Sequence, residues 1–247
     1  MAATITFLQV AKDATDLSEY TFSSQDLGVA ASDRYIVCTI QGQSNDGGAR
    51  TISSASIGGV SATISVNLVN SSGTGCGIII APVPTGTTGD VVITFSGTMG
   101  DCNIALYRCL GVGSVTATDT GSDSATGVPS EALSDTLNIS AGGIAVGVSQ
   151  NDISIATATW GNLTERFDEQ TANTNDMSGA SAEFATTQTG LTISCTWNND
   201  LVRSVLAMAS YPPITTNIKT VGGLAYASVK TVGGLAKASI KTIGGLG

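Results

Sequence analysis

Residues 51–69 read TISSASIGGVSATISVNLV, and this stretch indicates the fold of the chain. Two runs rich in Ile, Val, Ser and Thr alternate apolar and polar positions, which is the period of a half-buried β-strand. Gly58 and Gly59 lie between the runs. Paired glycines favour the two-residue turn of a β-hairpin, because both positions need a positive φ. The stretch therefore predicts an antiparallel hairpin that turns between Ile57 and Val60.

Strand-like runs of this kind recur along most of the chain at intervals of about 8–12 residues, a spacing typical of sandwiches and barrels. Only 12% of the 247 residues are charged, while 42% are hydrophobic, a composition that suits short strands joined by tight turns. We therefore predict an all-β protein with a jelly-roll-like antiparallel β-sandwich. The other runs are ITFLQV, RYIVCTI, CGIIIAPV, GDVVITFSG, CNIALYRCL, GGIAVGVSQ, ISIATATW, LTERF, LTISCTW and VRSVLAMASY.

The distribution of polar residues divides the chain into three segments. Residues 1–212 form the sandwich body, residues 213–217 of the PPITTN break form a linker, and residues 218–247 form a repetitive tail. A polar stretch at 116–134 interrupts the body. It is either a linker between two subdomains or a long crossover within one sandwich. The crossover is favoured because neither half offers a convincing full set of strands.

Charge is divided unevenly between the body and the tail. Residues 1–217 contain six basic and 19 acidic residues, a net charge of −13, whereas residues 218–247 contain four lysines and no acid. An acidic body disfavours nucleic-acid binding, since it offers little to neutralise phosphates. The basic tail suits an acidic partner surface. No apolar run approaches the roughly 20 residues of a membrane span, so we expect no membrane insertion.

The residue types that most often perform catalysis or hold metals are scarce. Histidine is absent, which excludes Ser-His and Cys-His nucleophile pairs and removes the commonest metal ligand. Five cysteines lie mostly in apolar strand-like surroundings, and none forms a C-x-x-C pair. We expect inert buried thiols, and neither a metal nor another cofactor. The cysteines are Cys38, Cys76, Cys102, Cys109 and Cys195.

Two acidic clusters are the remaining candidates for chemistry. Glu165, Asp168 and Glu169 lie close together in LTERFDEQ, and two carboxylates beside aromatic residues are what a glycosidase uses. The competing interpretation is a solvated strand end or a local ion pair, since these acids lie beside Arg166. The Asp-rich stretch 119–123 offers oxygen ligands for Ca²⁺, but it lacks the spacing of an EF-hand loop. A solvated loop is the favoured interpretation there, and we predict no catalytic residue.

Trp160 and Trp197 are the candidates for contact with a glycan, as on the aromatic surfaces of lectin-like sandwiches. The alternative is that they fill the core. Trp197 lies in the alternating run ISCTWNND, which favours a core position for one of its faces.

The tail, residues 218–247, reads IKTVGGLAYASVKTVGGLAKASIKTIGGLG and repeats every eleven residues. Each Gly-Gly pair suits a two-residue hairpin turn, in which Val232 pairs with Leu235 and Lys230 falls opposite Lys237. Like charges directly opposite are destabilising, so we expect the strands to be ordered by partners, either in a trimeric β-structure or along a neighbour's sheet edge. A flexible low-complexity tail is the alternative. The expected assembly residues are Val221, Leu224, Val232, Leu235, Ile243 and Leu246.

The units KTVGGLA at 219–225, KTVGGLA at 230–236 and KTIGGLG at 241–247 resemble C-terminal repeats of tailed-bacteriophage structural proteins. The body stretches ASIGGVSATI, APVPTGTTGDVVITFSG and WGNLTERFDE resemble phage β-sandwich proteins that lack an assigned activity. The resemblance implies a non-enzymatic virion protein, a fibre, spike or decoration subunit. It implies a homo-oligomer, with a trimer favoured, bound to other virion proteins.

The N-terminus lacks both the basic start and the long apolar core of a signal peptide, so we expect synthesis in the host bacterial cytoplasm and incorporation into the virion. Two other functions stay open. The body is a carbohydrate-binding adhesin that contacts a host surface glycan through the tryptophans, or a polysaccharide depolymerase that acts through Glu165 and Asp168.

Overall fold

The computed structural model describes residues 1–128, 132–153, 156–173 and 175–215, together with four pairs of tail residues, 220–221, 224–225, 231–232 and 235–236. Residues Ala2–Ile214, here called the body, form one compact unit. Its sheets are antiparallel, and the described residues contain no helix. The predicted all-β class is therefore confirmed.

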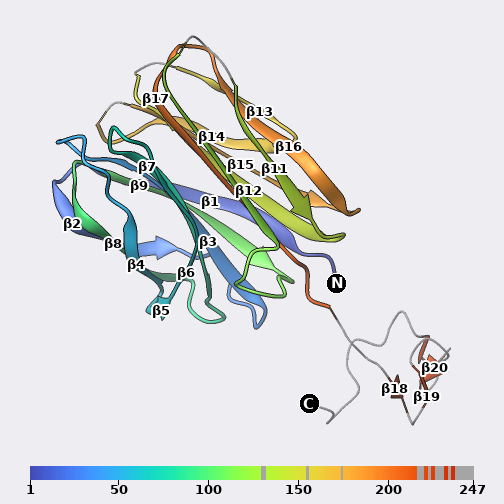
Figure 1. Ribbon diagram of the computed structural model, residues 1–247. Coiled ribbons are helices and arrows are strands. Elements are labelled where there is room, and N and C mark those ends of the chain that lie inside the picture. Colours follow the sequence, from blue (N-terminus) through green and yellow to red (C-terminus); the bar gives the residue numbers. More distant parts are fainter. Residues whose placement is uncertain are drawn as a thin grey trace. The chain divides into compact units, whose positions relative to one another are not determined.

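The first half of the body is a sandwich of two sheets (Figure 1). The inner sheet has the strand order β1-β9-β3-β7-β6, and the outer sheet has the order β2-β8-β4-β5. The inner strands are β1 (Thr4–Asp13), β3 (Arg34–Gln43), β6 (Thr63–Val69), β7 (Thr74–Pro82) and β9 (Cys102–Leu110). The outer strands are β2 (Leu17–Asp26), β4 (Ile52–Ile57), β5 (Val60–Ser61) and β8 (Thr88–Met99).

The second half is another sandwich with its own inner and outer sheets. Its inner sheet has the order β10-β17-β12-β15-β14, and its outer sheet has the order β11-β16-β13. The inner strands are β10 (Asp119–Val128), β12 (Gly143–Asn151), β14 (Thr164–Gln170), β15 (Asp176–Phe184) and β17 (Leu201–Tyr211). The outer strands are β11 (Ala132–Ile139), β13 (Ala158–Gly161) and β16 (Gln188–Trp197).

The two sandwiches share one topology. When β1 is matched with β10, and the following strands in turn, both inner sheets have the same order, and so do both outer sheets apart from the short β5. In each half the first strands alternate between the two sheets, as they do in a jelly roll. The body therefore contains two jelly-roll-like sandwiches where the sequence favoured one.

The polar stretch at 116–134 is the reason that the sequence favours one sandwich over two. It was expected to be a crossover or a linker, but most of it forms β10 and the start of β11. Asp119, Asp123 and Gly121 made β10 look like a loop, since these residues are depleted in strands. The expectation was wrong because the pairing of β10 with β17 outweighs local preference.

The hairpin at 51–69 has the predicted turn. Ile57 pairs with Val60, and Gly58 and Gly59 have φ values of 58° and 78°. Both glycines therefore occupy the left-handed region that a type I′ turn requires. The predicted turn is therefore confirmed, but the hairpin is short: only β5 pairs with β4, whereas β6 (Thr63–Val69) pairs with β7 in the inner sheet.

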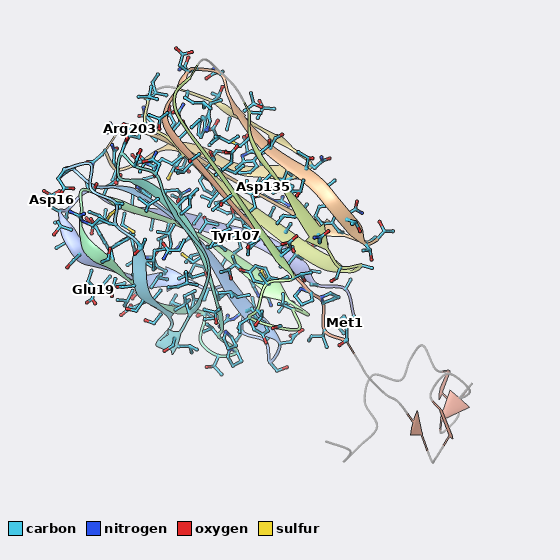
Figure 2. All side chains as sticks on the ribbon, in the orientation of Figure 1. Met1, Asp16, Glu19, Tyr107, Asp135 and Arg203 are labelled. Carbon is cyan, nitrogen blue, oxygen red and sulfur yellow. The ribbon has the colours of Figure 1, made fainter. Side chains whose placement is uncertain are left out.

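The four sheets of the body lie in layers (Figure 1), and three apolar cores fill the spaces between them. One core, with Tyr20 and Ile79, lies within the first sandwich, and one, with Trp197 and Ile193, lies within the second. The third core lies between the two inner sheets and includes Tyr107 and Tyr211. Figure 2 shows Tyr107 in the middle of the body. The central strands of the inner sheets, such as β3, β7, β12 and β17, are therefore buried on both faces.

All five cysteines are buried and free, as the sequence predicts. Cys102 and Cys109 lie on opposite faces of β9, Cys102 in the core of the first sandwich and Cys109 in the core between the inner sheets. Burial raises the pKa of the Cys195 thiol to about 12 and also raises the pKa of each of the other four thiols. These thiols are protonated at neutral pH, which suits inert packing residues.

Candidate functional site

The described part of the tail contains two short hairpins. Val221 pairs with Leu224, and Val232 pairs with Leu235, which is the register predicted for two-residue Gly-Gly turns. Ile243, Leu246 and the expected juxtaposition of Lys230 with Lys237 lie outside the described residues. The role of these residues in assembly stays a prediction.

Trp197 does not face solvent. Its side chain is 0% exposed in the core of the second sandwich, and its indole Nε1 donates to Ser149 Oγ at 3.1 Å. Because a fully buried ring offers no stacking face, the proposed glycan contact at Trp197 is wrong. The alternative interpretation of the sequence, a tryptophan that fills the core, is confirmed.

Trp160 is half-buried at the edge of the same core. Its Nε1 donates to Ser178 Oγ at 2.8 Å, so its polar atom is already bonded within the protein. The ring packs over Gly147 of β12, where an added Cβ would lie 2.7 Å from a ring carbon. The two tryptophans are thus packing residues of one sandwich and do not form a common aromatic surface.

Asp168 and Glu169 of LTERFDEQ border a shallow hollow of about 310 Å³ at the rim of the second sandwich, and Glu165 does not line it. Asp168 Oδ2 accepts a hydrogen bond from the backbone N–H of Ala158 at 3.0 Å. Burial raises the pKa of Asp168, although this hydrogen bond opposes the shift. Burial also raises the pKa of Glu165, and the nearby charge of Asp168 adds to it.

The charged residues of this cluster do not pair with one another. Glu169 pairs with Lys12 of the first sandwich at 2.8 Å, while the Nε of Arg166 donates to Ser181 Oγ at 2.9 Å. The expected pairing with Arg166 is therefore wrong. The cluster joins strand β14 to its neighbours through Asp168 and Glu169, and this structural role accounts for both side chains.

The Asp-rich stretch at 119–123 binds backbone N–H groups. Asp119 accepts from the N–H of Asn138, and Asp123 accepts from the N–H of Ser134, at 2.8 and 2.9 Å. Asp135 on β11 makes the reciprocal contact, accepting from the N–H of Ser122 at 3.0 Å. β10 and β11 belong to different sheets and are not paired by backbone hydrogen bonds, so these carboxylates connect the two strands instead. The expected solvated loop, with Ca²⁺ ligands as its alternative, is therefore corrected to a strand with bonded carboxylates.

Arg34 is the main polar feature that sequence reasoning missed. The side chain is 1% exposed, and its Nε and both Nη atoms donate to backbone oxygens at 2.6–3.1 Å. Burial lowers its pKa. The guanidinium joins two loops at the end of the first sandwich, beside a shallow hollow of about 540 Å³. Its acceptors are the oxygens of Leu27, Gly28, Val83, Thr85 and Gly86.

Every basic side chain of the body is engaged by another group of the body. Three form ion pairs, Lys12 with Glu169, Arg50 with Asp46 and Arg203 with Asp152. Arg34, Arg108 and Arg166 donate to backbone oxygens, and Arg166 also donates to a serine hydroxyl. The acidic groups outnumber these cations, and Asp16 and Glu19 are exposed at the outer edge of the first sandwich (Figure 2).

Comparison of the chain with protein-family models, with curated proteins and with solved structures finds no match. Within the part of the chain that the structure describes, no helix is long and apolar enough to cross a membrane. In the same residues, no group of three or more His, Cys, Asp or Glu side chains is placed to hold a metal ion. Functional inference therefore rests on this chain's own residues and their geometry.

Proposed function

We propose that this chain is a non-enzymatic structural protein of a tailed-bacteriophage virion, a fibre, spike or decoration subunit. The body is the displayed module, and residues 218–247 assemble it into a homo-oligomer, with a trimer favoured, and attach it to other virion proteins. The proposal begins from the resemblance of the KT[VI]GGL repeats to those of phage structural proteins. The following features of the structure support it.

The division of charge carries the proposal. The six basic side chains of the body are bound within it, whereas the tail has four lysines and no acid. Acidic bodies repel one another, so contact between subunits needs a cationic element. The tail is the part of the chain whose composition supplies one.

The surface of the body also favours assembly through the tail. Among the residues of the body that the structure describes, few large hydrophobic side chains are exposed, and these are Leu17, Val29 and Val202. Stable protein interfaces usually have an apolar centre, and isolated apolar residues do not provide one. The body is therefore suited to display, while the repeated Val and Leu of the tail are suited to association.

Asp168, Glu169 and the two candidate glycan-binding tryptophans have structural partners. Asp168 and Glu169 bond to other parts of the body, and both tryptophans donate their N–H groups internally. These contacts support a structural protein over a depolymerase or an adhesin that acts through these residues.

The test combines the full chain with a variant that changes Lys219, Lys230, Lys237 and Lys241 to Glu. We expect sedimentation to show an oligomer for the parent and a monomer with an unchanged circular dichroism spectrum for the variant. Changing the same lysines to Arg is the matched control and should preserve the oligomer. A monomeric parent, or a variant that assembles like the parent, would contradict assembly through the basic tail.

The virion assignment needs a separate measurement. Mass spectrometry of purified particles of the phage that encodes the chain should detect it at a fixed ratio to the major structural proteins. Its absence from washed particles would contradict the virion assignment even if the tail assembles the protein in solution.

A further inference from the structure

The inner sheets of the two sandwiches pack face to face. β3 packs on β12, which is its counterpart in the second half. β1 lies beside β15, and its Phe7 stacks on Phe167 of β14. Elsewhere along the junction β17 packs on β7 and β6, β12 packs on β7, and β10 lies beside β6. Strands of both inner sheets therefore form one contact surface between the halves.

The centre of this interface is apolar and closely packed. Val37 and Val146 are 0% exposed and hold matching positions on β3 and β12, within one core that draws on both sandwiches. Tyr107 crosses to β15, where an added Cβ on Gly179 would lie 2.9 Å from the tyrosine Oη. The glycine therefore makes room for a side chain of the other half. Such complementarity resembles the core of an interface between subunits.

Polar contacts surround this apolar centre. Gln43 Nε2 donates to Asp152 at 3.2 Å, and Tyr211 Oη donates to Ser65 Oγ at 2.8 Å. Lys12 pairs with Glu169 at 2.8 Å at another edge. An apolar centre with a polar rim is the usual anatomy of protein–protein interfaces.

Each half also has what an independent subunit needs. The first sandwich encloses its own core between β3 and β8, and the second encloses its own core between β12 and β16. The chain passes from one sandwich to the other once, between Leu110 at the end of β9 and Asp119 at the start of β10. The fold of either half does not need strands from the other.

We propose that the body is a fused pair of subunits. The inner sheet of each sandwich is a complete protein-binding surface, and its partner is the inner sheet of the other sandwich. The pairing is maintained by the interface and does not depend on the covalent connection. This inference is independent of the function of the tail.

The test uses the full chain with a protease recognition sequence inserted after the exposed Thr116. Cleavage of the folded protein yields two fragments, one for each sandwich. We expect them to elute together as a 1:1 complex at micromolar concentration, with an unchanged circular dichroism spectrum, and to separate only in denaturant. Fragments that separate or unfold in native buffer would overturn the proposal.

Two substitutions distinguish a specific interface between the halves from a general loss of stability. Tyr107→Ala should weaken the pairing of the cleaved halves by at least tenfold, because the side chain fills the centre of the interface. Tyr20→Ala is the matched control, since Tyr20 is equally buried but lies between the sheets of the first sandwich. It should lower the stability of that half without changing the dissociation constant of the folded halves.

A rim variant provides a second readout that does not disturb the core. Lys12→Glu places two carboxylates together at the contact with Glu169 and should raise the dissociation constant, most strongly at low salt. If neither Lys12→Glu nor Tyr107→Ala weakened the association, the proposed surface would be wrong.

Discussion

Phe7 and Phe167 stack across the junction of the two sandwiches, with ring centroids 5.7 Å apart and ring planes inclined by 25°. The two residues lie 160 positions apart in the chain, so this contact forms only when both halves have folded. It is therefore a local measure of how tightly the halves are joined.

A double-mutant cycle on this pair measures the coupling. Phe7→Leu and Phe167→Leu should each lower the free energy of unfolding. The double variant should lose about 0.5–1.5 kcal/mol less than the sum of the two single losses, which is the value of an aromatic pair. The cycle of Phe7→Leu with Phe95→Leu is the control, because Phe95 packs on Tyr20 in a different core. Urea unfolding provides the free energies. Equal coupling in both cycles would contradict a specific contact.

Arg34 should be among the side chains least tolerant of replacement. Arg34→Lys removes the planar fork and leaves several buried carbonyl groups without donors, so we expect a loss of more than about 3 kcal/mol. Arg108→Lys is the control, since Arg108 donates from Nε to a single carbonyl, that of Val29. It should cost less than about 1 kcal/mol. Similar midpoints for both variants in urea would show that the Arg34 network does not stabilise the fold.

Gly147 and Trp160 should be coupled by their packing. Gly147→Ala places a Cβ 2.7 Å from the indole ring and should destabilise the protein by about 1–3 kcal/mol through overpacking. The same change in a Trp160→Leu background should cost clearly less, because the obstructing ring is gone. Thermal unfolding of the four proteins in the cycle checks this. An equal cost in both backgrounds would assign the effect to the backbone of β12.

The sequence contains evidence for the layers of the body in addition to the alternation of apolar and polar residues. Outer strands such as β16 alternate in burial, whereas inner strands such as β7 and β12 are buried along almost their whole length. A continuous apolar run is typical of a strand that is covered on both faces. The runs CGIIIAPV and GGIAVGVSQ therefore contain evidence for the two inner layers, which a single sandwich does not explain.

Other features could not be predicted from local pattern. Strand β15 reads DMSGASAEF, and its small residues carry no strand signal because they make room for Phe167 and Tyr107 of other strands. Arg34 precedes an ordinary apolar run, and only the folded loops provide its carbonyl acceptors. Trp197 was recognised as a candidate, but its burial depends on small residues of β12 that lie far away in the sequence.

The stability of the body should depend on pH through Asp101. This side chain is fully buried, and it accepts hydrogen bonds from the N–H of Gln43 and from Asn103 Nδ2 at 2.7 and 3.0 Å. Burial nevertheless raises its pKa in the folded state. Between the unfolded value of about 3.9 and the raised folded value, the native protein binds more protons than the unfolded chain, so the contribution of Asp101 to stability falls as pH rises.

Asp101→Asn tests this because it mimics the neutral form at every pH. The unfolding free energy of the variant relative to the parent should increase as pH rises from about 4 and level off above the folded pKa. Asp46→Asn should show the opposite trend, because the N–H of Gly48 lowers the pKa of Asp46 and its contribution is lost on acidification. Urea unfolding at a series of pH values measures both. If the difference between Asp101→Asn and the parent stayed constant with pH, Asp101 would not be the titrating group.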